Sequence, residues 1–317
     1  MSRPILLGSA LVVLAAALFG TLSYVARSAD AVGVGALPFV SWRAILATAV
    51  LLAATLVLSA RGAARLPDPR QLGRGRQVAL TAAALCGALL NVAMFAAFLR
   101  TTIAVALICF YTFPAIVTLA SVRFYGERLD RSRLAALLLS SAGLLLVLTP
   151  VVQQSDVVID FLGIGLALFA AVCQAAFVLI SGRGFRPFRS IHVATYVIGA
   201  AVVVSVGLAV AAGDVGGLLL PLTQSDAWIW ILAGGLLGAA IPTTAFLAGI
   251  GLIGPSRAAI LMTIEPLVGV TLAGLLLGEQ PMIVQLVGGA AVLVAAAILQ
   301  AAPRAPARQE QEYPRLV

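Results

Sequence analysis

The 317-residue sequence contains no lysine, a single histidine and little charge of either sign. Charged residues make up 10% of the chain, whereas hydrophobic residues make up 62%, and the mean hydropathy is +1.11. Soluble globular domains do not have such a composition. The sequence therefore predicts an all-α polytopic membrane protein.

Several kinds of site are excluded by what is missing. One histidine, His192, cannot build a cluster of several histidines for catalysis or metal binding. The three cysteines, Cys86, Cys109 and Cys173, lie inside apolar stretches and lack the spacing of a disulfide framework or a metal site. We find no phosphate loop and no nucleotide motif, so neither an ATPase domain nor a cofactor is expected.

Apolar stretches long enough to cross a bilayer, about 20 residues each, divide the chain. Cutting at charges, Pro/Gly clusters and polar turns predicts ten transmembrane helices, over residues 5–26, 35–59, 77–99, 102–122, 133–151, 160–181, 191–212, 227–249, 256–277 and 283–301. The connections are short except 60–76 and 213–226. The first stretch is too long for a typical signal peptide, so we interpret it as an uncleaved helix.

The arginines predict the orientation in the membrane. If the N-terminus is cytoplasmic, 17 of the 20 arginines fall in cytoplasmic segments or at the adjoining helix ends, as the positive-inside rule requires. We therefore expect both termini, including the tail 304–317, in the cytoplasm and the protein in the inner (plasma) membrane. Because the positive charge lies in loops between apolar stretches, no nucleic-acid partner is expected.

Two stretches share one pattern. In Ala106–Glu127 and in Ala259–Glu279 a proline is followed twelve residues later by Gly-Glu, and the two prolines, Pro114 and Pro266, are 152 residues apart. This spacing predicts an internal repeat. Chance similarity between two apolar stretches is the alternative.

The repeat divides the chain into two halves, 1–151 and 157–303, with five predicted helices each. Because five is odd, the second half must enter the membrane upside down relative to the first. The predicted fold is therefore ten helices in two inverted five-helix repeats, a plan common in secondary transporters.

The motifs resemble those of the EamA-type family of the drug/metabolite transporter superfamily. The residues that carry the resemblance are Gly126-Glu127-Arg128-Leu129, Glu265-Pro266-Leu267 with Leu277-Gly278-Glu279, Tyr111-Thr112-Phe113-Pro114 and Trp42-Arg43. The resemblance implies a central substrate cavity surrounded by helices one to four and six to nine, with the fifth and tenth packed at the side. It also implies that the fourth and ninth helices bring Tyr111, Thr112, Pro114, Thr263, Glu265 and Pro266 near that cavity.

Glu265 is the strongest candidate for a functional residue. A carboxylate near the centre of a membrane helix costs about 2.5 kcal/mol or more, and Pro266 beside it removes a backbone hydrogen bond. Burial in a low dielectric favours the neutral form of a carboxyl group, so Glu265 could carry a proton across the membrane or bind an ammonium group. Alternatively, it caps backbone groups freed by Pro266, or it pairs with Arg43.

Arg43 lies within the second predicted helix, and two orientations are open for it. The side chain could extend to the outer headgroups, or it could point inward and bind a substrate carboxylate with its planar fork. If Arg43 and Glu265 both face a cavity, they would form a clamp for a zwitterion such as an amino acid.

Other polar residues and prolines within the helices are secondary candidates. Asn91 and Thr243 could line a wet cavity or hydrogen-bond across helices. Pro242 could kink the eighth helix beside the ninth. For Glu127 and Glu279, at helix ends, a structural role is favoured.

Together these features predict a secondary transporter, and not an enzyme, that moves a small metabolite by alternating access. An amino acid or an amphipathic compound is the expected substrate class, and export is the expected direction. Proton coupling through Glu265 and uncoupled facilitation or exchange both stay open. A membrane-embedded lipid-modifying enzyme is disfavoured for want of clustered histidines and acids. The expected partners are a small-molecule substrate and the lipid bilayer, and a homodimer stays open.

Overall fold

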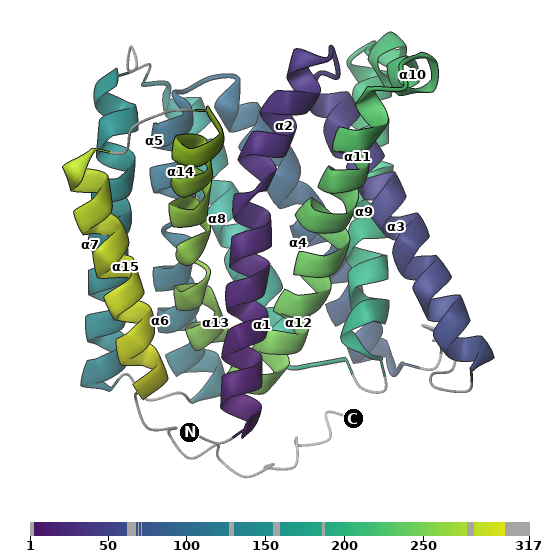
Figure 1. The fold of residues 1–317 in the computed structure, drawn as a ribbon. Coiled ribbons are helices and arrows are strands. Elements are labelled where there is room, and N and C mark those ends of the chain that lie inside the picture. Colours follow the sequence, from purple (N-terminus) through teal and green to yellow (C-terminus); the bar gives the residue numbers. More distant parts are fainter. Residues whose placement is uncertain are drawn as a thin grey trace.

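A bundle of long helices makes up the described part of the chain. The computed structural model describes residues 3–61, 68, 70, 72–126, 130–154, 159–185, 188–277 and 282–301. Within these ranges the ordered elements are all helices (Figure 1). An all-helical bundle suits a lipid environment because each helix satisfies its own backbone hydrogen bonds.

The helix boundaries follow the predicted ones closely. In chain order the helices are α1 (Arg3–Gly20), α2 (Leu22–Ala31), α3 (Ala36–Ala60), α4 (Arg74–Phe98), α5 (Ile103–Phe110), α6 (Phe113–Tyr125), α7 (Arg131–Gln154), α8 (Phe161–Gly182), α9 (Ser190–Ala211), α10 (Val215–Thr223), α11 (Ala227–Gly235), the π-helix η2 (Leu236–Ala240), α12 (Ile241–Ile253), α13 (Pro255–Leu261), α14 (Ile264–Leu277) and α15 (Ile283–Ala301).

Nine helical segments in the described ranges are long and apolar enough to cross a membrane. The ninth predicted span, 256–277, is divided by a turn at Met262 and Thr263 into α13 and α14. These pieces have 7 and 14 residues, and they are not among the nine segments. The ten-helix inverted arrangement therefore stays a prediction.

One connection is more ordered than expected. The segment 213–226, interpreted from sequence as a connection, contains helix α10, which lies at the end of the bundle opposite the start of α1 (Figure 1). The indole N–H of Trp42 in α3 donates to the Leu218 carbonyl oxygen of α10 at 2.8 Å. Trp42 also meets Trp228 of α11 edge to face, with ring centroids 5.3 Å apart. Helix α10 is thus attached to the end of α3, which in turn packs on the start of α11.

The long helices pack in pairs from opposite halves of the chain. The most extensive contacts join α7 with α15, α4 with α8, α1 with α12, and α3 with α9. Glycines bring α7 and α15 together, because a Cβ added at Gly143 would lie only 2.6 Å from the Gly288 carbonyl oxygen. Close approach through small residues is typical of helix association in membranes.

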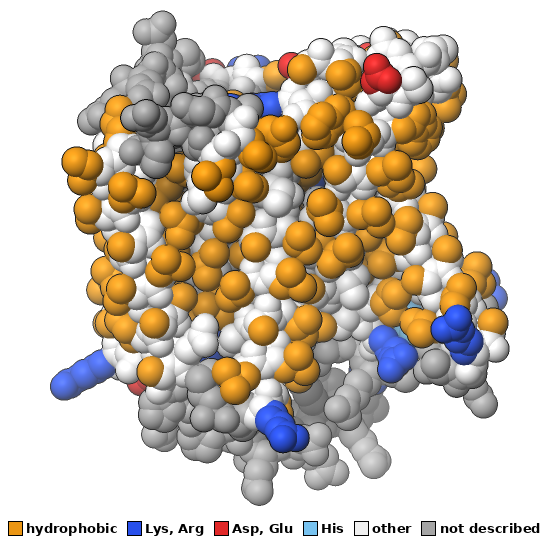
Figure 2. Space-filling view, viewed as in Figure 1, with side chains coloured by type: hydrophobic (Ala, Val, Ile, Leu, Met, Phe, Trp, Pro, Cys, Tyr) orange, Lys and Arg blue, Asp and Glu red, His pale blue; other side chains and the backbone are white. Residues whose placement is uncertain are grey.

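Apolar side chains cover the outside of the bundle. Leucines, valines and isoleucines on the long helices are widely exposed, and they form a broad band in Figure 2, with arginines below it. Such an extended apolar surface is unfavourable in water and is expected where the surface meets lipid.

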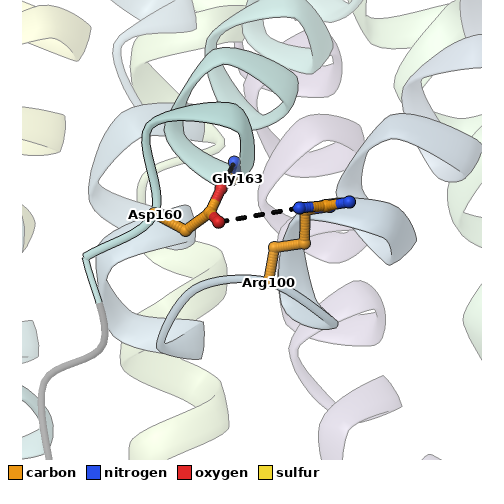
Figure 3. A network of polar contacts seen from close by, with 3 residues as sticks. All are labelled: Arg100, Asp160 and Gly163. Carbon is orange, nitrogen blue, oxygen red and sulfur yellow. Dashed lines mark hydrogen bonds and ion pairs between the residues drawn. The ribbon is translucent and has the colours of Figure 1, made fainter.

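A small polar network joins the end of α4 to the start of α8 (Figure 3). The Asp160 carboxylate accepts a hydrogen bond from the Gly163 N–H at 2.8 Å and so caps α8. Its second oxygen lies 3.6 Å from Nη1 of Arg100. Both side chains are partly exposed, and exposed ion pairs contribute only about 0.2–1 kcal/mol, so we regard the helix cap as the main contribution of Asp160.

The packing of α7 on α15 predicts the effect of one added methyl group. In Gly288→Ala the new Cβ would lie 2.5 Å from the Gly143 carbonyl oxygen, whereas a Cβ at Gly207 in α9 would meet nothing within 4 Å. Overpacking costs about 1–3 kcal/mol, so Gly288→Ala should unfold at a lower temperature in detergent, measured by circular dichroism. Gly207→Ala is the matched control, and equal unfolding temperatures for the two variants would contradict the packing.

Candidate functional site

Helix breaks come together inside the bundle. The first span is interrupted at Thr21 between α1 and α2, the fourth at Tyr111 and Thr112 between α5 and α6, the eighth by η2, and the ninth by the turn at Met262 and Thr263. Two close approaches join three of these breaks. A Cβ at Gly20 would lie 2.7 Å from the Glu265 carbonyl oxygen, and one at Gly238 would lie 2.6 Å from Cδ1 of Leu22. The breaks therefore form one connected layer.

The break before α14 follows from Pro266, which has no N–H to donate to the Met262 carbonyl oxygen. The Glu265 N–H donates to that oxygen instead, at 3.0 Å. The Thr263 hydroxyl donates to the Ile260 carbonyl oxygen at 2.7 Å. The backbone is thus satisfied locally, and the Glu265 side chain is not needed to cap it.

The break before α6 repeats this chemistry. Pro114 is the second residue of α6, and the Thr112 hydroxyl donates to the Cys109 carbonyl oxygen at 2.7 Å. In both breaks a threonine lies shortly before the proline, and its hydroxyl donates to the carbonyl oxygen three residues earlier in the chain. The two prolines therefore produce the same local structure in α5–α6 and α13–α14.

Glu265 and Tyr111 connect these two breaks. Their side chains are hydrogen-bonded to each other, the phenol of Tyr111 facing the Glu265 carboxyl group. Tyr111 is buried, whereas Glu265 keeps a partly accessible surface. The glutamate thus has a neutral partner and keeps part of its surface accessible.

Arg43 lies at the third break, beside η2. Pro242 cannot supply the N–H that the Gly238 carbonyl oxygen would accept in an α-helix. Nη1 of Arg43 donates to this oxygen at 3.3 Å. Nη2 of Arg43 donates to Oδ1 of Asn91 in α4 at 3.1 Å. π-Helical turns are frequent at functional sites, and here the turn presents a carbonyl oxygen to an arginine.

Asn91 is held in place by its other amide atom. Its Nδ2 donates to the Gly87 carbonyl oxygen one turn earlier in α4, at 2.7 Å. This bond leaves Oδ1 directed to Arg43. Asn91 therefore hydrogen-bonds across helices, which is one of the two roles left open from sequence.

The structure decides between two of the alternatives left open for Arg43. Its side chain bonds to α4 and η2 and so points inward, which excludes the extension to the outer headgroups. Among the described residues Arg43 forms no ion pair with Glu265, whose side chain pairs with Tyr111 instead. A direct Arg43–Glu265 pair is therefore wrong, and any clamp would need a ligand between them.

Two polar clusters result: Arg43 with Asn91 and the Gly238 carbonyl oxygen, and Glu265 with Tyr111. The remaining candidates lie outside both. Thr112 is exposed and Thr263 is buried, and each bonds to a carbonyl oxygen of its own segment. Thr243 is partly buried next to Pro242 and joins neither cluster. The helix-end residues Glu127, Gly278 and Glu279 and the tail 304–317 fall outside the described residues.

Sequence reasoning missed the break at Thr21 and the role of the Gly238 carbonyl oxygen. The sequence did contain a signal for the role of this oxygen. Pro242 lies four residues after Gly238, so the N–H that would bond to the Gly238 carbonyl oxygen in an α-helix is missing. Metal binding has no support in the described ranges, where no group of three or more His, Cys, Asp or Glu side chains could hold an ion.

Comparison with known proteins identifies the family. The model of the EamA-like transporter family matches residues 6–149 and again residues 161–300. The chain belongs to the EamA-like transporter family. This finding confirms the resemblance inferred from the motifs and makes the chain a multi-pass membrane protein of a transporter family.

One curated relative and one solved structure are similar to this chain. An uncharacterized transporter of Archaeoglobus fulgidus is 29% identical over 209 residues, which cover 64% of this chain and 70% of the relative. A solved structure described as "Crystal structure of protein" is 19% identical and superposes with a TM-score of 0.69, over 92% of this chain and 95% of the other. At that identity the second match shows a shared fold alone.

The hydrogen bond between Arg43 and Asn91 predicts non-additive mutations. In Arg43→Ala or Asn91→Ala one partner loses its bond, and a buried unsatisfied group costs about 1–3 kcal/mol. The double variant should lose less stability than the sum of the losses in the two single variants, with a coupling free energy of about 0.5–3 kcal/mol. Thermal unfolding in detergent measures these losses. Arg43→Ala combined with Thr271→Ala, an exposed site in α14, should be additive. Additivity in both pairs would contradict the bond.

Proposed function

We propose that this EamA-like protein is a secondary transporter that moves a small metabolite across the membrane, without chemical change, by alternating access. The observation that carries the proposal is the hydrogen bond between Glu265 and Tyr111, which joins the breaks of two separate spans. A partly accessible carboxyl group at a junction of broken helices is the arrangement expected of a transport site near the bilayer midplane.

An inverted repeat of 1–151 and 157–303 would supply the two moving parts. Three observations support it: the family model matches the chain twice, the breaks at Pro114 and Pro266 share one chemistry, and helices pair across the halves. These pairs join the first span to the eighth, the third to the sixth, the second to the seventh and the fifth to the tenth. That pattern is the one a two-fold axis would generate. We infer that the halves rock around the layer of breaks.

Glu265 is the proposed coupling residue. Its carboxylate can accept a hydrogen bond from the Tyr111 hydroxyl, and its protonated form can donate one to the same oxygen. Tyr111 therefore suits both protonation states, so a proton can bind and leave without an unpaired partner. An ammonium group of the substrate could occupy the same carboxylate, in which case transport is exchange or facilitation without a proton.

We further propose export from the cytoplasm, with both termini on the cytoplasmic side of the inner (plasma) membrane. Helix α1 begins and α15 ends at the same end of the bundle (Figure 1), which supports a common side for the two termini. The arginine bias of the sequence supports the cytoplasm as that side.

Proton flux in proteoliposomes tests this function. With a pH gradient imposed, amino acids and small amphipathic compounds are added one at a time and internal pH is followed with a trapped dye. We expect at least one compound to drive proton flux with wild-type protein and to lose most of that flux with Glu265→Gln, because the amide cannot take up a proton. Tyr111→Phe should reduce the flux less than Glu265→Gln does, since it removes only the hydrogen-bond partner of the Glu265 carboxyl group.

Asp226→Asn is the matched control, because this exposed carboxylate lies at the start of α11, away from the breaks. Its flux should equal that of the wild type. Counterflow of a labelled compound by wild type and Glu265→Gln alike, without proton movement, would contradict coupling through Glu265 and leave a facilitator or exchanger.

A further inference from the structure

The positive charge of Arg43 has no acidic partner among the described residues. Its two acceptors, the Gly238 carbonyl oxygen and Oδ1 of Asn91, are both neutral. A guanidinium group has five N–H donors in a rigid plane, so these two bonds leave donors unused. A cation inside a membrane bundle is unfavourable unless an anion or several dipoles compensate it.

The two acceptors fix the guanidinium in one orientation. Asn91 comes from α4 and Gly238 from η2, while Arg43 belongs to α3, so three elements meet at this group. Asn91 is itself held by the Gly87 carbonyl oxygen. A preorganised fork with free N–H groups is the arrangement that binds a carboxylate through two parallel hydrogen bonds.

The group keeps part of its surface accessible. Arg43 is only partly buried, as is Asn91. Arg43 also lies in the layer of helix breaks. Its acceptor Gly238 packs against Leu22 at the break between α1 and α2. Gly20, on the other side of this break, contacts the Glu265 backbone. The α1–α2 break thus lies between the Arg43 cluster and the Glu265–Tyr111 pair.

We propose that Arg43 is the binding group for a carboxylate of the transported molecule, with Asn91 as its positioning residue. This inference rests on the proposed transport function and names the substrate class as small carboxylates. The carboxylate of the ligand supplies the negative charge that Arg43 lacks within the protein. The other end of the ligand extends past the α1–α2 break to the Glu265–Tyr111 pair.

Arginine-specific modification tests the proposal without requiring transport. The protein, in vesicles of phosphatidylcholine alone, is treated with phenylglyoxal, and the modification of each arginine is followed by peptide mass spectrometry. Acetate is the probe, acetamide its uncharged analogue, and chloride at equal ionic strength the control for charge screening. Arg61, exposed at the end of the same helix, is the internal reference.

We expect acetate to slow the modification of Arg43 at least threefold and to leave Arg61 unchanged, while acetamide and chloride protect neither. In Asn91→Ala the protection of Arg43 should fall, because the guanidinium is no longer oriented. Equal rates with acetate and acetamide would overturn the proposal. So would equal protection by chloride, or an Arg43 that phenylglyoxal does not reach while Arg61 reacts.

The result is independent of the transport assay. Protection of Arg43 with no transport of any compound would leave the carboxylate site standing and remove the proposed transport function. Transport that is unchanged in Arg43→Gln, with no acetate protection in the wild type, would remove the carboxylate site and leave the transporter.

Discussion

Pairing of backbone hydrogen-bond groups inside the membrane is the constraint on which this structure depends. Each proline within a span removes one N–H, and the carbonyl oxygen four residues earlier needs another donor or a local rearrangement. At Pro266 the backbone of Glu265 supplies the donor, and at Pro242 the side chain of Arg43 donates to the oxygen. Arg43 and Glu265 therefore lie where helices are broken, because the same prolines that interrupt these helices create the polar positions.

This dependence explains why the two polar clusters are separate. Glu265 bonds to the phenol of Tyr111, and Arg43 bonds to an amide and a carbonyl oxygen, so neither charge neutralises the other. An ion pair between them would be self-sufficient and would compete with any ligand. Neutral partners hold both side chains in position without an opposite charge beside either one, which is what the proposed transport site requires.

The sequence predicted the helices better than their mutual orientation. Charges and turn residues bound each apolar stretch, and the predicted 283–301 is the span of α15. The rotation of α3 could not be predicted, because a helix that is apolar nearly all round does not indicate which face is inside. For this reason the inward direction of Arg43 and its bond to Gly238 required the structure, since the acceptor is 195 residues away. Helix α10 was missed because a short apolar segment with Pro221 resembles a connection.

The attachment of α10 to Trp42 has an optical consequence. The chain has three tryptophans, Trp42, Trp228 and Trp230, and all three pack in one apolar cluster at the end of the bundle where α10 lies. The opposite end, where α1 begins, holds none. Native tryptophan emission therefore reports on one end of the bundle only. In an unlabelled protein, it would distinguish an opening of the bundle at that end from an opening at the other.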